Sequence, residues 1–341
     1  MTSSAQKREP SQPSQRSFLH ILVSVHVPIS RLRVVRMLKF PPLPARAAYL
    51  HIDNVKRRNA LSLNVLRSLR DQLHRFNTGP DGQFRILPPF KPRILDDIEK
   101  AVDSDAPHEM KWLVNSEAWQ SARAGLPKVI VLRTDGPVFC SGHDLGEVAS
   151  LSRDEIKETF SLCAEVMTLI RRSPSPVLGV VQGMATAAGA QLAFTTDLLI
   201  ATPSTRFQLP GAKLGLPCTS PSTAVSRRLG NTLTYKMLAL AEPIEAKDLP
   251  PGTVDLVPAD QIEDSVAKMI QKLAVDPGQP QAFGKWAYWT QAGFNGSSDD
   301  HDGWEEAFSW TGRVMALHAR TSDAREGIES FLQKRQPDWI T

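Results

Sequence analysis

Two short runs of small residues have the composition of turns that could bind an anion through main-chain amides. One is GPVFCSGHDL (Gly136–Leu145), and the other is GMATAAGAQLAF (Gly183–Phe194). In each, a hydrophobic run leads into small residues, which let a ligand approach the backbone closely, and then into a helical pattern. The first amides of a helix lack an intrahelical partner, so two such turns facing each other would hold a developing oxyanion between two N–H donors.

Either turn alone is weak evidence for catalysis, because strand-to-helix junctions use the same small residues simply to pack closely. The second turn also differs from the GxGxxG dinucleotide fingerprint, since Ala185 and Ala188 stand at its third and sixth positions. The cysteines do not suggest a metal site. Cys140, Cys163 and Cys218 are widely spaced, with no CxxC or Cys/His cluster, so we expect three buried thiols.

The elements that must position these turns follow an α/β pattern. Hydrophobic β-branched runs predict strands at Lys128–Thr134, before the first turn, and at Val177–Val181, before the second. A further strand is expected at Asp197–Thr202, and an early one within AAYLHIDN, ahead of an amphipathic helix. That helix has leucines at helical spacing: Leu63, Leu66, Leu69 and Leu73. Strands that alternate with helices favour an α/β architecture of repeated ββα or βα units.

Residues 77–127 interrupt this pattern. The segment is rich in Pro and Gly and carries two weakly helical stretches, Ile94–Val102 and Glu109–Arg123, so we expect a surface insertion. After Val257 the pattern becomes helical and includes a Trp-rich stretch, Trp286–Trp310. Packing is the default role for these tryptophans, with an acyl pocket or a subunit contact as the alternative.

The first 45 residues differ in charge from the rest of the chain. They carry seven Lys and Arg against one Glu, a net +6 in a chain of +4, so the remainder is −2 and does not favour nucleic acid. This Ser-rich, acid-poor leader is typical of a mitochondrial transit peptide. The alternatives are a disordered tail or a cytoplasmic chain that starts at Met37. We expect a leader (1–45), a core (46–257) and a helical region (258–341), and no integral membrane segment.

Five segments, in order, resemble the crotonase (enoyl-CoA hydratase/isomerase) superfamily. VFCSGHDL is similar to its first oxyanion-hole motif, F-x-[AS]-G-x-D-[LI], and VQGMATAAGAQLA to its second, [IV]-x-G-x-[AC]-x-G-G-G-x-x-[LM]. RRNALS, TDLLIATPSTRFQLPGAKLGLPC and AREGIESFLQKRQPDW resemble the early N-A-L segment, the third block and the closing helix. The turns read most like a subgroup of hydratase domain-containing proteins. The resemblance implies an α/β fold, a crotonase-type ββα superhelix with a C-terminal helical, oligomerisation region.

The resemblance assigns the two amide donors of an oxyanion hole. They are the backbone N–H of His143, before Asp144, and that of Ala188, the middle residue of a glycine triplet in which Ala187 and Ala188 replace glycines. Asp144 is expected to cap the next helix. The His143 imidazole is expected to be a bystander, with an acid–base role beside the thioester as the alternative.

The catalytic glutamates of the superfamily's hydratases have no counterparts here. Their positions hold Gln191 and Gly211, and the acid of several isomerases falls at Thr219. Each acid–base group is typically worth about 10²–10⁴ in rate, so efficient hydration by the standard mechanism is not expected. The remaining polar candidates are His143, Glu147, Gln191, Lys213, Cys218 and Thr219. Glu147 reads better as an ordinary helix residue, and Cys218 as a buried thiol.

The resemblance places coenzyme A near the N-A-L segment and the first turn. The substrate-binding residues implied are Lys56, Arg58, Ala60, Gly142 and Gly189. The basic run could instead be an ordinary exposed turn. An acyl-CoA thioester would be the substrate, with no permanently bound cofactor, no metal and a homotrimer or homohexamer as the assembly. Three functions remain open: a weak or altered enoyl-CoA hydratase/isomerase-like enzyme of fatty-acid metabolism, a non-catalytic acyl-CoA-binding regulator of lipid metabolism, or a hydrolase or decarboxylase of a specialised acyl-CoA.

Overall fold

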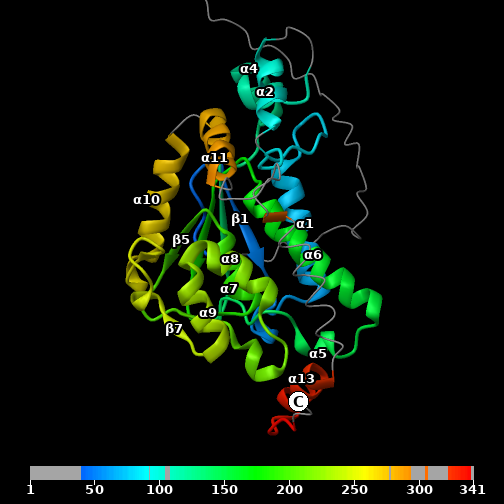
Figure 1. Ribbon diagram of the computed structural model, residues 1–341. Coiled ribbons are helices and arrows are strands. Elements are labelled where there is room, and N and C mark those ends of the chain that lie inside the picture. Colours follow the sequence, from blue (N-terminus) through cyan, green and yellow to red (C-terminus); the bar gives the residue numbers. More distant parts are fainter. Residues whose placement is uncertain are drawn as a thin grey trace, which may run out of the picture. The chain divides into compact units, whose positions relative to one another are not determined.

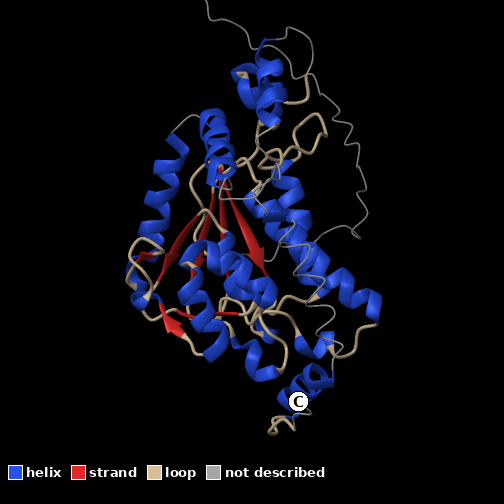
Figure 2. Ribbon diagram, viewed as in Figure 1, coloured by secondary structure: helices blue, strands red, loops and turns tan. Residues whose placement is uncertain are grey.

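The computed structural model describes residues 40–91, 93–103, 108–275, 278–292, 304–305 and 322–338. Its centre is a parallel sheet, whose strands are red in Figure 2. The five strands follow the order β1-β2-β3-β5-β8. The strands are β1 (Ala47–Ile52), β2 (Val129–Thr134), β3 (Val177–Val181), β5 (Leu198–Ala201) and β8 (Asp255–Leu256). The first four confirm the expected strands, whereas β8 is too short to give a pattern. The expected leader lies outside the described residues, except for its last few positions.

Both faces of the sheet are covered, which explains the unbroken hydrophobic runs of β2 and β3. On one face, Leu132 belongs to a core shared with α1 (Leu63–Asn77) and α6 (Arg153–Arg171). On the other face, Val131 belongs to a core shared with α10 (Ile262–Val275). Figure 1 shows α1 and α6 on one side of the sheet and α10 on the other. The predicted leucine stripe of α1 is confirmed, since all four leucines are buried.

A smaller sheet in the order β4-β6-β7 follows the main one along the chain. Its strands are β4 (Met184–Thr186), β6 (Arg206–Gln208) and β7 (Ile244–Glu245). The helical elements around it are α7 (Ala188–Thr195), η3 (Pro210–Leu214), α8 (Thr219–Leu229) and α9 (Asn231–Leu240). Every residue of α7 is buried, so this helix is held on all sides. Strands of two or three residues have no readable period, and the sequence therefore did not predict this sheet.

The segment at 77–127 has a hydrophobic core of its own. Its helices are α2 (Ile94–Asp103), α3 (Lys111–Val114) and α4 (Ser116–Ala122), close to the two helical stretches expected. They share buried residues with α11 (Gly278–Ala292). These are Leu87, Phe90, Ile98, Trp112, Leu113, Ala122, Ala282 and Trp286. The Trp286 indole N–H also donates to the Pro89 carbonyl at 3.1 Å, so the insertion and α11 form one unit.

The last described helix, α13 (Ser322–Gln333), packs against the short helices α5 (Leu145–Val148) and η3. Its Ile328 is buried with Val148 of α5 and with Leu216. Gly327 lies against η3 so closely that a Cβ there would stand 1.9 Å from the Leu214 carbonyl oxygen. The boundary expected after residue 257 stays a prediction. None of the described helices is long and apolar enough to cross a membrane.

Candidate active site

The first turn, which follows β2, is fixed to the segment that precedes α1. The Asn59 side-chain amide donates to two carbonyl oxygens of the turn, those of Asp135 at 2.7 Å and Val138 at 2.8 Å. The Leu61 amide donates to the Gly142 carbonyl at 2.8 Å. Gly142 itself has a φ of +85°, a conformation that side chains disfavour. The position of the turn therefore depends on the hydrogen bonds from Asn59 and on the positive φ of Gly142.

The second turn, between β4 and α7, contains a strained alanine. Ala187 has φ +51° and ψ −122°, outside the regions open to residues with a Cβ, and its amide donates to the Gln208 carbonyl at 2.9 Å. Strain of this kind costs about 1–3 kcal/mol and persists only where the surrounding structure imposes it. Ala188 is the first residue of α7. Its amide is therefore one of the donors that a helix cannot satisfy internally.

The two turns are joined by backbone hydrogen bonds. The Cys140 amide donates to the Met184 carbonyl at 3.2 Å, and the Thr186 amide donates to the Cys140 carbonyl at 3.0 Å. The approach is so close that a Cβ on Gly189 would lie 2.2 Å from the Cys140 carbonyl oxygen. Gly189 is the one glycine kept from the triplet, and its contact with Cys140 explains why.

Gly142 lies beside the start of α7. A Cβ placed on it would stand 2.9 Å from the Ala187 methyl and 3.4 Å from the Ala188 amide nitrogen. The His143 amide follows directly in the chain. In the described part of the chain, neither the His143 amide nor the Ala188 amide donates a hydrogen bond. We call these two N–H groups the amide pair. The structure therefore brings Gly142, the residue before His143, against the start of α7, and the role of the two amides as oxyanion donors stays a prediction.

Three buried polar side-chain atoms at the two turns lack a hydrogen-bond partner: His143 Nδ1, Thr186 Oγ1 and Gln191 Oε1. Such atoms are rare in proteins, because an unsatisfied buried polar group costs about 1–3 kcal/mol. The His143 ring meets Phe160 edge to face, with 4.7 Å between centroids. Burial lowers the pKa of His143 to about 4, so the imidazole is neutral at pH 7. A ligand with donors and acceptors would satisfy these groups.

Residues 117–341 match the family described as "Enoyl-CoA hydratase/isomerase". This chain belongs to the enoyl-CoA hydratase/isomerase family. Enoyl-CoA hydratase domain-containing protein 3, mitochondrial, of Rattus norvegicus is 33% identical over 291 residues, which cover 84% of this chain and 79% of the relative. The protein of the same name from Homo sapiens is 32% identical over 260 residues, 74% of this chain and 83% of the relative.

Solved structures agree with these relatives. The crystal structure of human enoyl Coenzyme A hydratase domain-containing protein 3 superposes with a TM-score of 0.53 at 29% identity, covering 85% of this chain and 94% of that one. Methylmalonyl CoA decarboxylase superposes with a TM-score of 0.60 at 19% identity, covering 86% and 94%, and supports the fold alone. The expected crotonase fold and the resemblance to the hydratase domain-containing subgroup are both confirmed.

The two positions at which we expected the family's glutamates both contact the start of α8. Gln191, fully buried on α7, donates from Nε2 to Ser220 Oγ at 3.1 Å. The Gly211 amide donates to Cys218 Sγ at 3.3 Å. A Cβ on Gly211 would stand 2.1 Å from the Leu216 carbonyl oxygen and 2.9 Å from the Cys218 sulfur. The loop that ends η3 therefore leaves no room for a glutamate side chain at this position.

Asp144, in the first turn, and Glu147, just after it, hold helices in place. Asp144 caps α5 by accepting from the Glu147 amide at 3.2 Å, and it accepts two hydrogen bonds from Arg57 at 3.0 and 2.7 Å. Burial alone would raise the pKa of Asp144, but the hydrogen bonds from Arg57 and from the backbone outweigh it, and the pKa is lowered. Glu147 Oε2 accepts from the Leu63 amide at 3.0 Å, at the first residue of α1.

The remaining predicted residues are spread around this centre. Lys56 and Arg58 are exposed, whereas Ala60 is buried. The Arg58 carbonyl accepts from the Ser141 amide at 3.1 Å, which places the basic run against the first turn. Lys213 is exposed on η3. All three cysteines are buried and free. Burial raises the pKa of Cys218 to about 12, which argues against a nucleophilic thiolate.

Two residues of this site were not singled out from the sequence, Asn59 and Thr186. Asn59 is the asparagine of the N-A-L segment. Its side-chain amide is buried and donates to two carbonyl groups, which explains why an asparagine stands there. Thr186 is the only hydroxyl in a run of Gly, Ala and Met, GMATAAGA, and its side-chain oxygen is one of the buried atoms without a partner. A polar residue in an otherwise small, apolar turn is the signal that could have identified it.

Proposed function

We propose that this chain binds an acyl-CoA thioester and stabilises the enolate form of its carbonyl through the amide pair of His143 and Ala188. One observation carries the proposal: Gly142 lies against the Ala188 amide, and neither amide of the pair has a protein acceptor. Removing one donor from such an oxyanion site typically lowers the rate by about 10²–10³. Family membership supports the thioester as the ligand.

Hydration by two glutamates is not part of this proposal. Gln191 does not titrate, and Gly211 packs against Leu216 and Cys218 without space for a side chain. Two missing acid–base groups, each worth about 10²–10⁴, would reduce hydration far below the rate of an enzyme that has them. The reaction that remains accessible is polarisation of the thioester and slow exchange of a Cα proton.

His143 is the group best suited to assist that exchange. Its Nδ1 atom is buried, has no protein partner and belongs to a neutral imidazole at pH 7. A neutral ring nitrogen can accept a hydrogen bond from bound water and so assist proton movement. The low pKa of the ring makes it a weak base, which is a further reason to expect slow turnover.

The second candidate is a non-catalytic acyl-CoA-binding regulator of lipid metabolism. The observation that favours it is the packing at Gly211, because a catalytic carboxylate there would require the η3 loop to be rebuilt. Both candidates predict acyl-CoA binding, and they differ in whether a proton is exchanged. The relatives are named mitochondrial, so we place this protein in mitochondria and in fatty-acid metabolism, with the homotrimer or homohexamer of the expected family assembly.

Three measurements on the full chain test these functions. Calorimetry with butyryl-CoA, which has no double bond to hydrate, measures binding. NMR of butyryl-CoA in deuterated water measures exchange at Cα, and absorbance with crotonyl-CoA measures hydration. We expect butyryl-CoA to bind and its Cα proton to exchange slowly. We expect the rate of crotonyl-CoA hydration to be several orders of magnitude below that of a family hydratase with both glutamates. Binding without exchange would establish the regulator in place of the enzyme. Absence of binding would refute the acyl-CoA assignment, and rapid crotonyl-CoA hydration would refute the argument from Gln191 and Gly211.

A further inference from the structure

A cavity of about 460 Å³ lies at the edge of the sheet opposite to the amide pair. Its lining includes Arg46, Pro127–Lys128 and Pro176, which directly precede β1, β2 and β3. The two turns follow the other ends of β2 and β3, about 20 Å away for strands of this length. The volume is within the range of about 300–1,000 Å³ that is typical of small-molecule sites. The cavity is therefore separate from the site described above.

The lining of this cavity is cationic. It includes Arg46, Arg123 and Lys128, and none of its sixteen residues is Asp or Glu. Within the described residues, none of the three cations forms an ion pair. The first turn of the 15-residue helix α11, including Gln279, also faces the cavity, and the N-terminal end of a helix carries partial positive charge. Lys128 Nζ donates to a neutral oxygen, the Ala274 carbonyl, at 2.7 Å. These groups together favour an anion in the cavity.

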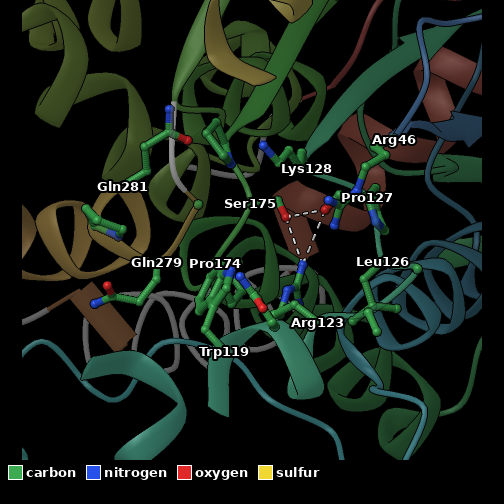
Figure 3. Close-up of a pocket in the computed structure, with 16 residues that line it drawn as sticks. Arg46, Trp119, Arg123, Leu126, Pro127, Lys128, Pro174, Ser175, Gln279 and Gln281 are labelled. Atoms are coloured by element: carbon green, nitrogen blue, oxygen red, sulfur yellow. Dashed lines mark hydrogen bonds between the residues drawn. The ribbon is translucent and has the colours of Figure 1, made fainter. Parts of the chain in front are cut away.

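Arg123 is the least exposed of the three cations, with 4% of its surface accessible. Its guanidinium donates only to neutral oxygens: Asn77 Oδ1 at 3.1 Å, Ser175 Oγ at 2.8 Å and the Pro127 carbonyl at 3.4 Å. Figure 3 shows the guanidinium turned toward Ser175 and Pro127. Burial, assisted by the charge of Arg46, lowers the pKa of Arg123 to about 10. A buried charge without an opposite charge is costly, so a bound anion would stabilise this arrangement.

One wall of the cavity is apolar. It includes Trp119, whose ring packs on Gly278, and Pro174 beside it (Figure 3). We propose that this cavity binds a phosphomonoester of a small metabolite, with the phosphate between Arg46, Arg123 and Lys128 and a flat or apolar group against Trp119. Arg and Lys side chains bind phosphate oxygens through charge-assisted hydrogen bonds, and a planar group stacks on an indole ring.

The test is calorimetry on the full chain with two probes, inorganic phosphate and phenyl phosphate. We expect phenyl phosphate to bind more tightly than inorganic phosphate. Arg46→Gln and Lys128→Gln should each weaken both probes by about tenfold, the loss typical of one charge-assisted contact. Trp119→Leu should reduce phenyl phosphate affinity to that of inorganic phosphate and leave inorganic phosphate unchanged. Arg206→Gln, an exposed arginine on β6, is the matched control and should change neither affinity.

Each alternative outcome is decisive. No binding of either probe at millimolar concentration would overturn the proposal, as would binding that is unaffected by Arg46→Gln and Lys128→Gln. Equal weakening by Arg206→Gln would show non-specific attraction by the net charge. Equal affinity for the two probes would overturn the role of Trp119 and leave a site for inorganic phosphate. Thermal melts of every variant check folding, and butyryl-CoA binding should be unchanged because the amide pair lies at the other edge of the sheet.

Discussion

Replacing Gly142 with alanine tests the amide pair without touching a titratable group. The added methyl would stand 2.9 Å from the Ala187 Cβ, 3.1 Å from the Thr186 carbonyl oxygen and 3.4 Å from the Ala188 nitrogen. Optimal separations between such atoms are about 3.5–4.0 Å, so the turns must separate by several tenths of an ångström. Misplacement of about 1 Å can cost a hundredfold in rate.

The expected result is therefore a selective loss at the thioester. Isotope-edited infrared spectra of butyryl-CoA labelled with ¹³C at the carbonyl should show the stretch moved to lower wavenumber in the wild type, because two donors weaken the C=O bond. Gly142→Ala should abolish most of that displacement and slow Cα proton exchange by about 10²–10³, the usual loss for one oxyanion donor. The displacement reports polarisation even if turnover is absent.

Gly136→Ala is the matched control. Gly136 is in the same turn with φ +84°, against +85° for Gly142, and its added Cβ would meet only the exposed Val55 side chain, at 2.9 Å. Both variants carry the cost of a positive φ, about 1–2 kcal/mol, and should unfold at similarly lower temperatures. Only Gly142→Ala should lose the infrared displacement. A wild-type displacement that survives Gly142→Ala, or disappears equally in Gly136→Ala, would refute the assignment of the amide pair.

Three further outcomes follow from the same turns. Ala187→Gly should stabilise the protein by about 1 kcal/mol in urea denaturation, because glycine adopts φ +51° without strain; a destabilised variant would contradict the strain argument. Gly211→Glu should cost about 3 kcal/mol or more in the same assay, since its Cβ meets a carbonyl oxygen at 2.1 Å; a stable variant would show that the loop can open. His143 has its pKa lowered from 6.5 to about 4 by burial, so its contribution to stability is complete above pH 6.5 and is lost as the pH falls toward 4. His143→Gln should reduce the slope of unfolding free energy against pH in that window by up to about 1.4 kcal/mol per unit, and an unchanged slope would contradict the burial of the ring.

The strands that carry the two turns were predictable because hydrophobic pattern and burial coincide there. β3 begins and ends where the run VLGVV does, and β2 begins one residue after the expected start. Both strands are covered on two faces, so VLGVV and the first four residues of β2, VIVL, are continuously apolar and the pattern is unambiguous. The two turns were recognisable by their small residues. Gly142 and Gly189 must be small, because a Cβ there would come within 3 Å of Ala187 and Cys140 respectively.

The features that the sequence did not reveal depend on contacts between distant segments. Gly211 has no space for a side chain because Leu216 and Cys218 fold back over it. The sequence alone does not distinguish a glycine that must be small from one at which a larger residue would also fit. The strain at Ala187 was likewise hidden, because an alanine in a helical pattern is ordinarily relaxed. Asn59 could be assigned only when the two carbonyl groups it reaches were located.

The core that α11 shares with the insertion limits which truncations, deletions and chimeras of this chain can fold. The Trp286 indole donates to the Pro89 carbonyl and is buried with Leu113, so each segment covers apolar side chains of the other. A splice variant or truncation that ends before Gly278 would leave Trp112 and Leu113 facing solvent, and removing the insertion would do the same to Trp286. We therefore expect the two segments to be retained or lost together, and a chimera with a relative should exchange both or neither.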